Sequence, residues 1–202
     1  MTAGPVLGAP CSLGNAALAT SGRGACWWPA VHLPFPGAPY RPRVTVLLPP
    51  AGLHPALTLH PGPVPAAVQA AVGRLRGPDP RLPGRAAHAA LYAQAVADGT
   101  LVGFCLAEEP NTEPGASWAH HGAAGPELGV LVVDPRWRGR GLGVGLVGAV
   151  ARAVAASGRT AVAVTAPASP AVAVNRRVGA RVAGTFRRGP EELWLWDFAG
   201  VR

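Results

Sequence analysis

One stretch of the chain concentrates residue types that can bind anions. Residues 133–143 read Val-Asp-Pro-Arg-Trp-Arg-Gly-Arg-Gly-Leu-Gly, and no acidic residue occurs from position 136 to position 186. The stretch lies between an apolar run typical of a strand and a run whose apolar residues repeat at helical spacing. A helix that begins there presents unpaired N–H groups and a partial positive charge, and glycines let an anionic group approach the backbone closely. The sequence therefore predicts a phosphate or polyphosphate site.

Two well-known phosphate sites can be compared with this stretch. Residues 143–148 read Gly-Val-Gly-Leu-Val-Gly, which is the GxGxxG pattern of dinucleotide-binding proteins. The pattern starts inside the expected helix instead of at the turn before it, and no acid follows where a ribose would need one. A P-loop is excluded because its pattern requires a lysine and the chain has none. We therefore disfavour a dinucleotide.

The composition narrows the class of protein. All 18 basic residues are arginine, and the formal net charge is +8. That charge would suggest a nucleic-acid partner, but arginine without lysine, beside 27 glycines and 23 prolines, is typical of GC-rich coding. We therefore disfavour nucleic acid and keep it as a rival. Hydrophobic residues make up 49% of the chain. No apolar run approaches the about 18 residues that cross a bilayer, so we expect a folded protein outside the membrane.

Cysteine and proline usage indicates the compartment and the domain limits. Three scattered cysteines form no CxxC pair, so the sequence predicts neither a disulfide framework nor a metal site, and we expect a cytoplasmic protein. Thirteen of the 23 prolines lie in residues 1–65, and four lie beyond residue 126. We interpret residues 1–40 as a Gly/Pro-rich N-terminal extension with the composition of a disordered segment, and residues 41–202 as one domain.

Apolar periodicity predicts strands and helices that position the anion site. Strands are expected at residues 43–48, 86–97, 100–107, 128–133, 160–165, 181–186 and 191–198. The alanines of residues 86–97 would also suit a helix, and the turn that follows favours the strand. Helices are expected at residues 66–75, 141–157 and 170–177. Asp98-Gly99 predicts a hairpin between the second and third strands, and a surface loop is expected over residues 108–126. This order is typical of an α/β domain.

Residues Arg138-Gly-Arg-Gly141-Leu-Gly143 resemble the pyrophosphate signature of the GNAT superfamily of acyl-CoA-dependent N-acyltransferases: Gln or Arg, two residues, Gly, one residue, then Gly or Ala. Residues 127–135 resemble the family's fourth strand, residues 92–106 its second and third strands, and residues 178–180 the end of its last helix. The likeness covers residues 90–198 well and residues 41–89 loosely. It implies an α/β (α+β) fold with a mixed, mostly antiparallel central sheet flanked by helices on both faces.

The resemblance also implies a reaction. Acetyl-CoA would be the co-substrate, and a primary amine on a small molecule or peptide would accept the acetyl group by direct transfer. Main-chain N–H groups around Gly141 would hold the CoA pyrophosphate, and the free edge of the preceding strand would pair with the pantetheine amides. The residues expected to bind the cofactor are Leu131, Val132, Val133, Arg138, Gly139, Arg140, Gly141, Leu142, Gly143 and Val144.

Acyl transfer to an amine needs a base, a group that stabilises the oxyanion and a route for the thiolate. Glu127, which opens the strand beside the expected thioester, is the candidate base, with a salt-bridged strand end as the alternative. A backbone N–H near Val133 is the expected oxyanion donor. Family members often carry a tyrosine as the acid where this chain has Asn175, and asparagine can only hydrogen-bond the thiolate or the pantetheine. The general acid therefore stays unassigned.

Asn175 keeps a second reading open, namely a CoA-binding module that no longer catalyses. His120 and His121 in the expected loop could supply a base to the acceptor, with solvated side chains as the alternative. Trp118 in the same loop is a candidate acceptor contact, and Cys105 is expected to be a buried thiol. A homodimer is left open.

Overall fold

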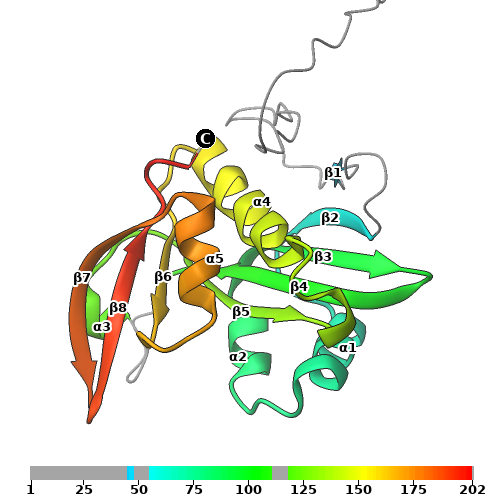
Figure 1. Cartoon of the computed structure of the whole chain (residues 1–202), viewed down its shortest axis with the longest axis horizontal. Coiled ribbons are helices and arrows are strands. Elements are labelled where there is room, and N and C mark those ends of the chain that lie inside the picture. Colours follow the sequence, from blue (N-terminus) through cyan, green and yellow to red (C-terminus); the bar gives the residue numbers. More distant parts are fainter. Residues whose placement is uncertain (1–44, 48–54, 111–117, 202) are drawn as a thin grey trace, which may run out of the picture.

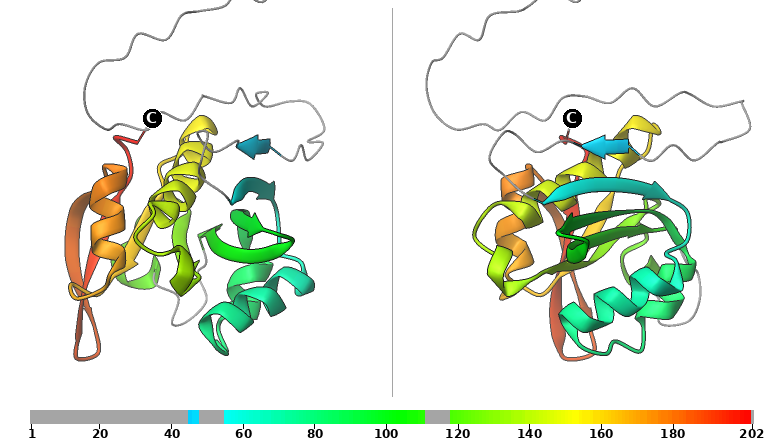
Figure 2. Two further views of the ribbon diagram at one scale, coloured as in Figure 1. Left: turned by 45° about the vertical axis from the view of Figure 1, so that its right-hand side comes forward. Right: turned by 90° about the vertical axis from the view of Figure 1, so that its right-hand side faces the viewer.

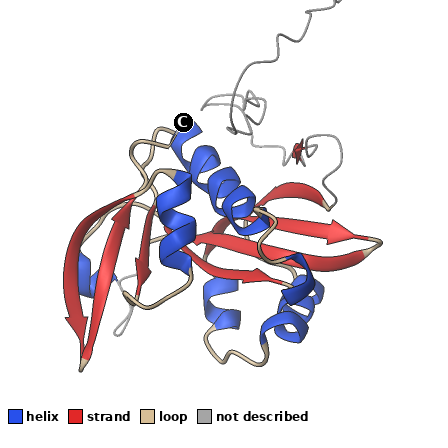
Figure 3. Cartoon of the chain, viewed as in Figure 1, coloured by secondary structure: helices blue, strands red, loops and turns tan. Residues whose placement is uncertain are grey.

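The computed structural model describes residues 45–47, 55–110 and 118–201, so the expected extension over residues 1–40 lies outside the described residues. The chain contains both strands and helices (Figure 3). The strands are β1 (Thr45–Leu47), β2 (Ala56–Pro61), β3 (Ala89–Ala97), β4 (Thr100–Glu108), β5 (Glu127–Val133), β6 (Val162–Thr165), β7 (Arg181–Arg188) and β8 (Glu191–Asp197). The helices are α1 (Ala66–Arg76), α2 (Leu82–Ala87), α3 (Trp118–His121), α4 (Leu142–Ala156) and α5 (Ala171–Val178), with a 3₁₀ turn η1 (Pro135–Trp137).

The strands form one sheet in the order β1-β2-β3-β4-β5-β6-β8-β7 (Figure 1). β5 and β6 run parallel, and each other neighbouring pair is antiparallel. The expected mixed, mostly antiparallel sheet is therefore confirmed. The parallel pair is joined by α4, because parallel strands need a crossover connection.

The parallel pair β5 and β6 is held together only at one end. Its register covers two pairs, Glu127 with Val162 and Leu128 with Ala163. Beyond them β5 has a β-bulge, in which Val130 and Leu131 lie opposite one residue of β4, and Val130 has a φ of 52°. A positive φ is rare for a β-branched residue and costs about 1–3 kcal/mol. A bulge bends its strand, and β5 and β6 diverge in Figure 1.

Helices cover both faces of the sheet, as expected (Figure 2). On one face α4 contributes Leu146 and Val150 to a buried cluster that also contains Trp196 of β8. On the other face α1 and α2 pack over β3, β4 and β5, in a cluster that includes Val72 and Phe104. No helix in the described ranges is long and apolar enough to cross a membrane.

Periodicity predicts neither β2 nor α2, and it places Glu108 in a loop. Glu108 is instead the last residue of β4 and is buried. α2 has six residues and contains Gly84, a poor helix former, so its sequence carries little helix signal even though Pro83 suits its first turn. It forms because Leu82 and Ala86 are buried in the cluster on the second face, which is a tertiary effect.

We expect Leu146→Ala to lower the free energy of unfolding by about 2–5 kcal/mol, because Leu146 is fully buried and its removal leaves a cavity. Val182→Ala is the control, because Val182 is 44% exposed and its truncation should change stability by less than about 0.5 kcal/mol. Urea unfolding of the two variants measures the difference. Equal unfolding midpoints would contradict the packing described for α4.

Candidate functional site

A cavity of about 800 Å³ opens where β5 and β6 separate. Its lining includes each residue that the sequence predicts for the site except Arg140. The second half of β5 and the loop before α4 form one end of the lining, and α5 adds Asn175. Glu127 of β5 and Arg85 of α2 also line the cavity. The fold therefore brings the predicted anion-binding turn and the predicted base into one space.

The loop between β5 and α4 has backbone N–H groups that no backbone carbonyl of the described residues accepts. The Asp134 carboxylate accepts the Arg136 backbone N–H at 2.9 Å, which fixes the turn η1. Gly139 and Gly141 have φ values of 73° and 81°, a conformation that favours glycine. The first backbone bond of α4 is from Gly145 N–H to the Gly141 carbonyl. Within the described residues, the backbone N–H groups of positions 139–144 have no backbone acceptor, as expected for a helix start.

The three arginine side chains of this loop contact protein groups. Arg136 forms an ion pair with Asp134, with 2.9 Å between Nη2 and Oδ2. Arg138 donates from Nε to the Val133 carbonyl at 3.1 Å. The Arg140 guanidinium lies 5.3 Å from the centroid of the Trp137 ring. The anion-binding capacity of the loop therefore lies in its main chain, and the side chains add positive charge around it.

The outer half of β5 has an open backbone edge. Asp134 N–H donates to the Val102 carbonyl of β4 at 2.8 Å. Because antiparallel pairs alternate, the Val132 backbone is bonded to β4, and the Val133 N–H points away from β4 toward the cavity. Of the expected pantetheine contacts, Val133 thus offers its backbone N–H at the free edge, while its carbonyl accepts from Arg138 and the backbone of Val132 is bonded to β4.

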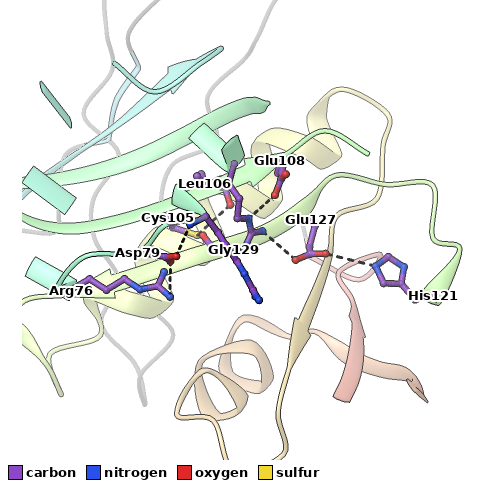
Figure 4. A network of polar contacts seen from close by, with 10 residues as sticks. Arg76, Asp79, Cys105, Leu106, Glu108, His121, Glu127 and Gly129 are labelled. Carbon is purple, nitrogen blue, oxygen red and sulfur yellow. Dashed lines mark hydrogen bonds and ion pairs between the residues drawn. The ribbon is translucent and has the colours of Figure 1, made fainter. Parts of the chain in front are cut away.

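Glu127 lies in a buried network of charges (Figure 4). Its side chain is 7% exposed, and Oε1 lies 3.2 Å from Arg85 Nη2. Arg85 Nε also donates to Glu108 Oε2 at 2.6 Å, so one guanidinium joins two carboxylates from adjacent strands. The alternative of a salt-bridged strand end is therefore compatible with the position of Glu127 in the cavity wall. Sequence reasoning missed Arg85, because α2 has no helical pattern and the contacts are long-range.

Gly129 makes room for this guanidinium. A Cβ atom built on Gly129 would overlap the Arg85 guanidinium and lie 2.7 Å from Nη1 and 2.8 Å from Cζ. These separations are shorter than a carbon atom tolerates. Arg85 therefore crosses β5 at the one residue between Glu127 and the bulge that has no side chain.

His121 and Trp118 are buried, which corrects the expectation of a solvated loop. The His121 side chain is 1% exposed, and its Nδ1 accepts the Ala123 backbone N–H at 3.1 Å. Nε2 must then carry the proton of the neutral ring, and it lies 3.7 Å from Glu127 Oε2. Trp118 donates from Nε1 to the Gly125 carbonyl at 3.1 Å and is a core residue. The His120 side chain lies outside the described part of the chain.

Asn175 of α5 is 3% exposed and lines the cavity. Its backbone carbonyl accepts the Ala180 N–H, while its side-chain Nδ2 has no hydrogen-bond partner among the described residues. A buried amide without a partner is costly, so its presence in a cavity wall is typical of a group that meets a ligand. Cys105 is also buried, and burial raises the pKa of its thiol to about 12, which excludes it as a nucleophile at neutral pH.

Comparisons with known proteins find one matching family model and several structures with a similar fold. Residues 101–188 match the family model described as FR47-like protein. No curated protein matches the sequence. A GNAT-family acetyltransferase structure from Desulfovibrio desulfuricans is similar, with a TM-score of 0.53, 16% identity, and coverage of 70% of this chain and 97% of that one. A GNAT-family acetyltransferase from Bordetella pertussis has a TM-score of 0.53 and 18% identity, with coverages of 70% and 94%. The ribosomal-protein-S18-alanine N-acetyltransferase of Escherichia coli has a TM-score of 0.52 and 15% identity, with coverages of 70% and 92%.

Asp134 should give the loop a characteristic pH dependence. Hydrogen bonds from Arg136 lower the pKa of Asp134 from 3.8 to about 2. The stabilisation is therefore fully present above pH 4 and is lost as the pH falls toward 2. We expect the difference in free energy of unfolding between the wild type and Asp134→Asn to shrink across this window. Urea unfolding at several pH values between 6 and 2 measures it, and parallel curves would contradict the account.

Proposed function

Because the chain has the fold of the GNAT acetyltransferases, we propose that it is an N-acetyltransferase that transfers an acetyl group from acetyl-CoA directly to a primary amine in the cytoplasm. One observation carries the proposal. A single cavity connects free backbone donors at the start of α4, the open edge of β5 and the buried carboxylate of Glu127. The acceptor would be an amine on a small molecule or a peptide.

The backbone donors and the positive charge around the cavity support coenzyme A as its ligand. Backbone N–H groups at positions 139–144 would hold the diphosphate, where the helix dipole and nearby arginines favour negative charge. At Gly143 even an added Cβ atom would meet Val133 and Val174 only at ordinary contact distance, so this position leaves space between α4 and β5. The outward N–H of Val133 would donate to a carbonyl of the pantetheine arm, as a strand donates to an added strand.

Glu127 would accept the proton of the amine, directly or through a water molecule. Acetyl-CoA supplies an acetyl group activated as a thioester. The oxyanion donor is expected near Val133, but Glu127 and Val133 lie six residues apart on one strand, a distance of about 20 Å. The base and the oxyanion donor must both reach the same reacting carbonyl, so this distance is too long. The β-bulge at Val130 and Leu131 lies about halfway along that distance, and a bulge leaves a residue unpaired with the neighbouring strand. We therefore assign the oxyanion contact to the bulge.

Asn175 takes the place of a general acid in this proposal. Its Nδ2 is buried in the cavity wall without a partner, so it can donate a hydrogen bond to the leaving sulfur or to a pantetheine carbonyl. An amide cannot give up a proton, and the thiolate would leave without protonation by the protein. The alternative is a CoA-binding module without catalysis. Asn175 favours it, because this residue stands where family members often carry the tyrosine that acts as the acid.

The decisive experiment combines calorimetry with acetyl-CoA and steady-state thiol release with a panel of primary amines. Binding together with amine-dependent release supports the transferase. Binding without release on any amine supports the module, and the absence of binding contradicts both. A third reading, a nucleic-acid-binding protein, predicts DNA or RNA affinity that falls steeply with salt.

We expect Gly141→Ala to weaken acetyl-CoA binding about tenfold, because an L side chain at φ 81° costs about 1–2 kcal/mol and shifts the loop. Gly189→Ala is the matched control, since Gly189 has a φ of 60° but lies in the β7–β8 turn. Calorimetry of both variants separates local strain from a general loss of stability. A loss of affinity equal in both would contradict the placement of the diphosphate.

Glu127→Gln should lower kcat about 10²–10³-fold, because an amide cannot accept the amine proton, while acetyl-CoA affinity stays unchanged. Glu109→Gln serves as the control, because Glu109 lies next to the end of β4 and pairs with Arg159 outside the cavity. Steady-state kinetics measure kcat for the two variants, and calorimetry measures their affinity for acetyl-CoA. Full activity of Glu127→Gln would remove this residue from the mechanism.

A further inference from the structure

Arg85 offers the cavity a hydrogen-bond donor that the protein does not use. Nε is bonded to Glu108 at 2.6 Å, and Nη2 is paired with Glu127 at 3.2 Å. Nη1 makes no hydrogen bond within the described ranges. The side chain is 26% exposed and lines the cavity beside Gly129. Two carboxylates thus fix the guanidinium, and its third nitrogen is free to bind a ligand.

We propose that Arg85 and Glu127 form a two-point site for an α-aminoacyl group, so that the acceptor is an amine with a carbonyl or carboxylate on the adjacent carbon. Glu127 would take the amine, and Arg85 would donate from Nη1 to the oxygen. This inference rests on the proposed acetyl transfer and adds the chemical class of the acceptor.

The spacing of the two groups matches such an acceptor. By standard bond lengths, the amine nitrogen and carbonyl oxygen of an α-aminoacyl group lie about 3 Å apart. Glu127 Oε1 and Arg85 Nη2 are 3.2 Å apart, and Nη1 is bonded to the same guanidinium carbon as Nη2. A carboxylate oxygen and the Nη1 donor therefore lie close enough together for one α-aminoacyl group to reach both. A lysine side chain has no oxygen near its amine and would satisfy only the carboxylate.

The charge of the cavity points the same way. Four arginines line it, namely Arg76, Arg85, Arg138 and Arg177, whereas Glu127 is the one acidic residue in the described lining. A polyamine would bring several positive charges into this field. An acceptor with one amine beside a carbonyl or carboxylate oxygen gives a guanidinium a partner, and charge-assisted hydrogen bonds of this kind are strong.

Arg85 also has a structural role, because it neutralises the buried Glu108, and the test must separate the two roles. Arg85→Lys keeps a positive charge beside Glu108 but removes the planar set of donors. Gly129→Ala leaves Arg85 in the chain and displaces its guanidinium. The control is Arg81→Lys, because Arg81 is exposed and lies outside the cavity lining.

The test compares kcat/KM for glycinamide and for 2,2-difluoroethylamine, both calculated per free base. Fluorine lowers the basicity of the alkylamine toward that of an α-amino group, so the carbonyl is the difference that matters. We expect the wild type and Arg81→Lys to prefer glycinamide about tenfold, the factor of one charge-assisted hydrogen bond. Arg85→Lys and Gly129→Ala should lose this preference while acetyl-CoA affinity stays unchanged.

Each outcome decides the inference. Equal kcat/KM for the two amines in the wild type overturns it and leaves the transferase standing. A preference that survives in both Arg85→Lys and Gly129→Ala also overturns it, and if one variant does not fold the other decides. The absence of thiol release with every amine overturns the proposed function and the acceptor class with it.

Discussion

The separation of β5 from β6 is the constraint on which the rest of the site depends. Two residue pairs hold the parallel strands together, and the bulge at Val130 then turns β5 away. Strand edges are normally satisfied by a neighbour, so an open edge inside a sheet leaves backbone donors without partners. The φ of Val130 is strained, and the packed cores on both faces of the sheet hold the residue in that conformation.

The parts of the fold that depend on local pattern could be predicted from sequence. Apolar spacing predicts α4, and Asp98-Gly99 predicts the β3–β4 hairpin. The glycines at 139 and 141 predict the turn before α4. Arg85 could not be predicted as a site residue, since its helix has six residues, contains Gly84 and is stabilised only by tertiary burial. The burial of Glu108 likewise depends on a partner from a distant part of the sequence.

Two buried carboxylates lie beside the cavity. Glu108 and Glu127 are both buried, and removing two carboxylates from water costs more than one guanidinium usually returns. A core made for stability alone would place apolar side chains there. The network instead holds a carboxylate in the cavity wall, with the Nε2 proton of neutral His121 on its other side. Its contribution lies in orientation more than in stability.

The contact between Arg85 and Gly129 has an evolutionary consequence. The guanidinium keeps its present position only while position 129 lacks a side chain, because a Cβ atom there would displace it. Each residue therefore determines which substitutions the other tolerates. Homologues that alter one of these positions should therefore alter both, and an alignment should show positions 85 and 129 as a covarying pair far apart in sequence.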